Sequence, residues 1–72
     1  MDYITYLVET NKHKNVEELA KLYEYSAKLK YHSTGDIMIS EQIETAILWI
    51  LKFKDKIFNK KFNAYKRRID NE

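Results

Sequence analysis

The apolar positions of this chain recur with helical spacing in three stretches, which short polar segments separate. The first stretch, residues 2–11, begins with Asp2, whose carboxylate suits the N-cap of a helix. Its apolar face would comprise Tyr3, Ile4, Leu7 and Val8. A strand would instead place Ile4, Tyr6 and Val8 on one face. We prefer the helix because the other periodicities in the chain are helical. The pattern therefore predicts a short helix followed by a polar connector.

A second helix is predicted over residues 15–32. Asn15 stands three residues before Glu18 and resembles the start of a capping box, in which each side chain bonds the other residue's backbone amide. The helically spaced positions are Val16, Leu19, Leu22, Tyr23, Ser26, Ala27 and Leu29. Residues 16–28 also resemble part of a helix-turn-helix repressor, but Glu24 stands where the turn glycine of that motif is expected. We therefore predict one unbroken helix, with the chain's only glycine in the turn beyond it.

The third stretch predicts one long helix, which begins at residue 37 or 40 and ends at residue 69. Its apolar arc is roughly 180° wide, whereas a single core contact needs only ~100°. At ~1.5 Å per residue the second helix could cover slightly more than half of its length. The uncovered part would pack against the first helix or against a second copy of the chain, and we expect a homodimer. The dimer interface would comprise Leu51, Phe58, Phe62, Tyr65 and Ile69.

Length and composition agree with a single all-α domain over residues 1–72, a helical hairpin plus a short N-terminal helix. The chain has no Cys, which excludes disulfides and thiolate metal sites. Its longest apolar run, residues 46–51, is about a third of a membrane span. Asp2 follows the first methionine, without the cationic region of a secretory signal, so we expect a cytoplasmic protein. Lys, Asn, Ile and Tyr supply 30 of the 72 residues, and their AT-rich codons hint at a phage or another mobile element.

Catalytic chemistry has little support in this sequence. His13 lies in a polar connector and His32 at a helix end, and no nucleophile is placed near either. Glu41 and Glu44 share one side of a helix, a spacing typical of solvated surface. His13, His32 and Asp36 could form a metal site only if the fold happened to bring their side chains together. We therefore expect neither an enzyme nor a cofactor.

The charge is strongly segregated along the chain. Residues 1–51 carry five Lys against eight Asp and Glu, a net −3, whereas residues 52–68 carry six Lys and two Arg against Asp55, a net +7. One side of the predicted long helix presents a row of residues that begins with Trp49 and is otherwise mostly cationic. The row comprises Trp49, Lys52, Lys56, Lys60, Asn63 and Arg67.

This row is the predicted partner-binding site. Trp and Arg are common anchors of protein interfaces, so we expect a small regulator or inhibitor that binds another protein. The alternative is a nucleic-acid-binding protein of the transcriptional-regulator type, because cationic residues beside an Asn suit phosphates and an adenine edge. Otherwise the row would be a solvated face with Trp49 in the core, or the basic residues would pair with the acidic residues 1–51 of a partner subunit. Membrane attachment is not expected, because folding would consume the apolar side.

Overall fold

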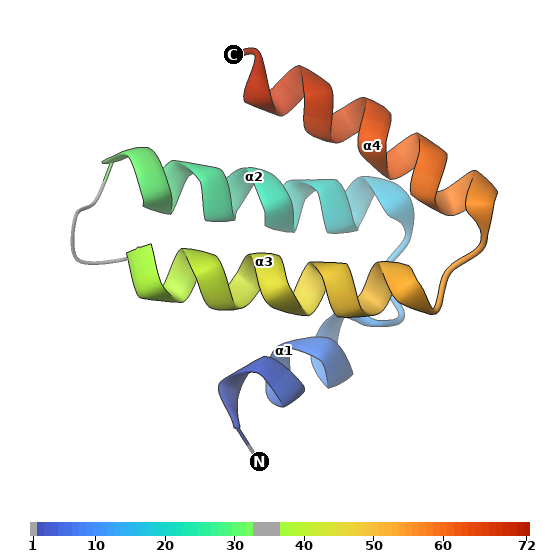
Figure 1. Ribbon diagram of the computed structural model, residues 1–72, viewed down its shortest axis with the longest axis horizontal. Coiled ribbons are helices and arrows are strands. Elements are labelled where there is room, and N and C mark those ends of the chain that lie inside the picture. The colour runs from blue at the N-terminus through green and yellow to red at the C-terminus, as the bar shows by residue number, and fades with distance from the viewer. Residues whose placement is uncertain (1, 33–36) are drawn as a thin grey trace.

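The structure of the protein, a computed structural model, describes residues 2–32 and 37–72 (Figure 1). The described residues form four helices and no strand, which confirms the all-α class. The helices are α1 (Tyr3–Asn11), α2 (Val16–His32), α3 (Ile37–Lys52) and α4 (Lys56–Asp70). The turn between α2 and α3, in which we placed the glycine, lies outside the described residues.

The first two helices begin where the sequence predicted, because local side chains satisfy their free amides. An Asp2 carboxylate oxygen accepts a hydrogen bond from the Thr5 amide at 2.7 Å. At the start of α2, the Glu18 amide donates to Asn15 Oδ1 at 2.8 Å, and the Asn15 amide donates to Glu18 Oε1 at 3.4 Å. The capping box is therefore present, and α2 runs on without the turn of a helix-turn-helix motif.

The prediction of one long C-terminal helix is wrong, because the chain turns at residues 53–55, which we call the hinge. The Phe53 and Lys54 amides bond carbonyls only three residues back, so the last turn of α3 tightens. Asp55 then caps α4 by accepting from the Phe58 amide at 2.8 Å. The side-chain amide of Asn59 donates to the carbonyl oxygens of Leu51 at 3.0 Å and Asp55 at 2.9 Å. These bonds satisfy the backbone groups that the break exposes.

The four helices pack as an antiparallel α2–α3 hairpin with one helix on each side of it (Figure 1). The N-terminal α1 lies against α3, and α4 folds back against α2. The wide apolar arc of α3 is explained by this arrangement, since α2 and α1 both cover it. The buried core comprises Leu7, Leu19, Ala20, Tyr23, Ile43, Ala46, Ile47, Ile50 and Phe62.

Residues expected at a homodimer interface pack inside the chain instead. Phe62 is only 2% exposed, and its ring meets the ring of Tyr23 edge to face with centroids 6.0 Å apart. The other four are half-buried against the same core: Leu51, Phe58, Tyr65 and Ile69. The apolar face that seemed to need a second subunit is therefore covered by the chain's own α2, because the hinge lets α4 fold back.

Two side-chain contacts fix how α2 meets its neighbours. Ser26 and Ser40 are fully buried where α2 meets α3, and each hydroxyl donates to the other residue's carbonyl oxygen, at 3.2 and 2.9 Å. Such small side chains let the two helices approach closely. The Tyr23 hydroxyl of α2 donates to Asp70 Oδ1 at the end of α4, at 2.6 Å. Burial raises the pKa of Tyr23, and the bond to Asp70 raises it further.

Candidate binding surfaces

An exposed pair of aromatic rings stands at the C-terminal end of α3. Trp49 is 48% exposed and Phe53 is 77% exposed, so neither ring belongs to the core. The two rings are stacked, with centroids 6.4 Å apart and planes 20° from parallel. The Lys52 ammonium lies 4.9 Å from the centroid of the Trp49 ring, within cation–π range. We call these three residues the aromatic surface.

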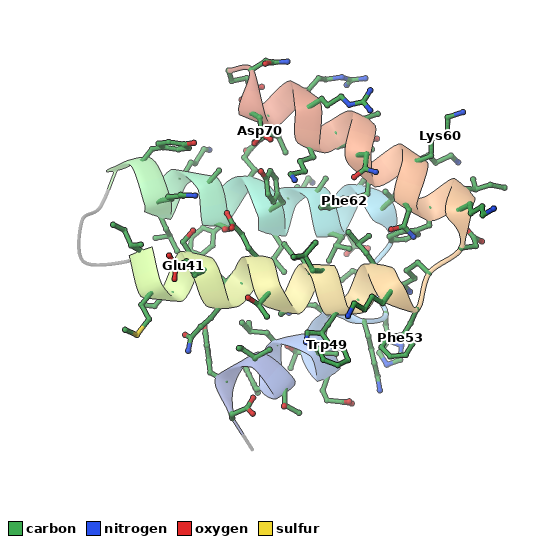
Figure 2. All side chains as sticks on the ribbon, viewed as in Figure 1. Glu41, Trp49, Phe53, Lys60, Phe62 and Asp70 are labelled. Carbon is green, nitrogen blue, oxygen red and sulfur yellow. The ribbon has the colours of Figure 1, made fainter. Side chains whose placement is uncertain are left out.

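The aromatic surface follows from helical spacing together with the way α3 is covered. Residues four apart on a helix are neighbours, and Phe53, the first residue after α3, keeps close enough to this spacing for its ring to stack on that of Trp49. Figure 2 shows both rings on the side of α3 that faces away from Phe62 and α4. The core positions of α3 lie on other sides of the helix, so these rings remain in solvent. Phe53 was not among the predicted binding residues, although its spacing from Trp49 was a usable signal.

A second surface runs along the outer side of α4. Exposed cationic side chains at helical spacing line a shallow depression of about 390 Å³, together with two Asn side chains and one Ala. Its lining comprises Lys56, Asn59, Lys60, Asn63, Ala64 and Arg67, and we call it the basic surface. No acidic side chain is among these lining residues. The basic surface therefore offers fixed positive charge to an anionic partner.

The break at the hinge divides the predicted partner-binding row into these two surfaces. Trp49 and Lys52 end α3, whereas Lys56, Lys60, Asn63 and Arg67 follow one another on α4. Trp49 and Lys60 lie on opposite sides of the α2–α3 hairpin in Figure 2. A single straight helix would present Trp49 and these cationic residues to the same target. In the folded chain they face different sides of the molecule.

A third depression, of about 480 Å³, opens between α2, α3 and α4. Its charged lining mixes both signs, with Lys30 and Lys66 against Glu44 and Asp70. Asp70 is already bonded to Tyr23, and the Lys66 ammonium lies 5.8 Å from the centroid of the Tyr23 ring. Two of these four charged groups, Asp70 and Lys66, are therefore already in contact with Tyr23.

The described residues contain no group of three or more His, Cys, Asp or Glu side chains that could hold a metal ion. Of the candidate set, His13 is exposed, whereas Asp36 and the side chain of His32 lie outside the described residues. Glu41 is exposed and Glu44 is half-buried. Over the described part of the chain, the helices all lack the length and apolar character needed to cross a membrane.

Comparison with protein-family models, with curated proteins and with solved structures found no match to this chain. On the aromatic surface and the basic surface, Trp49, Phe53 and the cationic side chains of α4 are exposed, whereas the Asn59 amide is already bonded at the hinge.

Proposed function

We propose that this is a small non-enzymatic regulator or inhibitor that acts by binding another protein through the aromatic surface. The observation that carries the proposal is the exposed, stacked pair of Trp49 and Phe53. Exposed apolar side chains that stand singly need no explanation, whereas adjoining exposed apolar rings form a patch of the kind that interaction sites use. The chain has a complete core without them.

The geometry of the aromatic surface also suits tight binding. The two rings are stacked on each other, so part of their side-chain freedom is already lost before a partner covers them. Lys52 lies beside the rings and would meet an acidic group at the rim of the partner's pocket. Truncation of such an aromatic anchor typically weakens binding by about 2 kcal/mol or more, which is about 30-fold in the dissociation constant.

The test is to find a cellular protein that the native chain captures and to measure its affinity for variants by calorimetry. We expect Trp49→Ala and Phe53→Ala each to weaken binding by about 30-fold. Tyr31→Ala is the matched control, because Tyr31 on α2 is exposed to the same 77% as Phe53. Circular dichroism of each variant separates loss of binding from loss of fold. Binding that is insensitive to both aromatic substitutions, or equally sensitive to Tyr31→Ala, would refute the proposal.

A second candidate function is nucleic-acid binding through the basic surface, which its acid-free lining favours. Lys56, Lys60 and Arg67 would contact phosphates, and Asn63 could read an adenine edge. The affinity for an oligonucleotide should then fall with salt, with a logarithmic slope of about −0.9 for each phosphate neutralised on duplex DNA.

Charge reversal tests this second candidate on an oligonucleotide. We expect Lys56→Glu with Lys60→Glu to abolish binding, whereas Trp49→Ala leaves it unchanged. The control is Lys21→Glu with Lys28→Glu, which makes the same change of charge on the exposed side of α2. Equal losses from both double variants would show only a general charge effect. They would rule out the basic surface as a specific site.

A further inference from the structure

We propose that the chain has a second folded state, a domain-swapped homodimer. In this state α3, the hinge and α4 form one continuous helix, and α4 of each copy packs on α2 of the other copy. The inference goes beyond the proposed function and rests on three features of the structure: the hinge, the contacts of α4, and the apolar side chains beside the hinge.

The hinge is made of residues that a helix accepts. It is three residues long and contains neither Gly nor Pro, the residues that usually break helices. The apolar periodicity of the sequence continues across it, which is why one helix was predicted there. Straightening would replace the cap of Asp55 and the carbonyl bonds of Asn59 with ordinary main-chain helix bonds. These local polar bonds therefore favour the bent form over the straight form.

The contacts of α4 can be rebuilt between two copies without loss. Within the chain, α4 packs mainly on α2. Phe62 supplies its buried ring, and Asp70 supplies the acceptor for the Tyr23 hydroxyl. In a swapped dimer the same residues meet across the two copies, so the packing energy is conserved. Only a second copy of this chain offers the matching α2, which identifies the occupant.

The swapped form would also bury apolar surface that the closed chain leaves in water. Phe53 is 77% exposed and Ile57 is 68% exposed, one on each side of the Asp55 cap. They are four residues apart, so a continuous helix would place them side by side on one face. The two hinges of a swapped dimer meet each other, and this apolar pair would lie at their contact. The gain from that contact opposes the loss of the caps.

A continuous helix would restore the row of partner-binding residues that the closed chain divides. Phe53 belongs both to the aromatic surface and to the hinge contact of the dimer. We therefore expect the closed monomer to bind the protein partner and the swapped dimer to present the cationic row.

The first arm of the test measures the dimer dissociation constant by light scattering from micromolar to millimolar concentrations. We expect Asp55→Ala with Asn59→Ala to lower this dissociation constant by about tenfold or more, because the cap and the carbonyl bonds that favour the bent form are removed. The matched pair Lys54→Ala and Lys54→Gly removes the same ammonium group but differs in helix propensity. We expect the dissociation constant of Lys54→Gly to exceed that of Lys54→Ala by about fivefold or more.

The second arm uses the native chain, so it does not depend on any variant folding. Isotope-labelled and unlabelled protein are unfolded together and refolded, and an isotope-filtered nuclear Overhauser experiment is recorded on the mixed dimer. The Tyr23 and Phe62 rings have centroids 6.0 Å apart, and in a swapped dimer this contact joins two different copies. An interchain signal between these rings supports the proposal. A dimer with only the intrachain contact, or monomers throughout at millimolar concentration, would overturn it.

Discussion

The hydrogen bond between Tyr23 and Asp70 gives a direct measure of how firmly α4 is held to α2. Tyr23→Phe removes the hydroxyl that donates to Asp70 Oδ1 at 2.6 Å and leaves the ring in place. A hydrogen bond to a charged group contributes about 1.5–3 kcal/mol, but exposed Asp70 would regain water in the variant. We therefore expect a loss of about 1 kcal/mol in the free energy of unfolding. For a domain of this size, that lowers the melting temperature by about 4–8 °C.

A double-mutant cycle with Asp70→Ala isolates this contact from other effects of the substitutions. We expect a coupling energy of about 1 kcal/mol between the two positions, measured by denaturant unfolding. Tyr25→Phe on the same helix is the control, since Tyr25 is exposed, and its hydroxyl loss should change stability little. Strictly additive effects of Tyr23→Phe and Asp70→Ala would refute the reasoning, because the two groups would then not be coupled.

The buried hydroxyl of Tyr23 also makes the stability of the fold fall at alkaline pH. The pKa of Tyr23 is raised above its ordinary value of 10.0, chiefly by burial and then by the bond to Asp70. The unfolded chain releases this proton near pH 10 while the folded chain keeps it, so rising pH favours unfolding above that value. The stability advantage of the native chain over Tyr23→Phe should therefore be complete at about pH 8 and shrink above about pH 10. An unchanged difference at both pH values would contradict this account.

The remaining predictions concern packing and capping, and each is checked by denaturant unfolding. Phe62→Ala should cost about 3–5 kcal/mol because the ring is buried, whereas Ile57→Ala should change little because Ile57 is 68% exposed. Ser26→Val should cost about 1–3 kcal/mol by placing a larger side chain where the Ser26 and Ser40 hydroxyls are packed together, and an unchanged stability would show space beside Ser40. Asn59→Ala should cost about 1–2 kcal/mol, because three carbonyl oxygens near the hinge lose its amide.

Several features of the fold could be predicted from the sequence because they depend on residues close together in the chain. The caps at Asp2 and Asn15 join groups three residues apart, so local sequence is sufficient to place them. The apolar face of α2, including Ser26, follows from helical spacing alone. Four members of the predicted row, Lys56, Lys60, Asn63 and Arg67, lie together for the same reason, because they follow one another along one side of α4.

What the sequence by itself determined is therefore the helical class, the two N-terminal helices and the charge of the C-terminal segment. Tertiary structure decided that Phe62 fills the core, that Trp49 stays exposed, and that the cationic row is divided at Asp55. The physical reason is that a periodic pattern reports local structure and not the contacts between distant segments. Helical periodicity is the same for one long helix and for two helices joined by three residues. The choice between them depends on whether α4 gains more by packing on α2, a contact between segments far apart in the sequence.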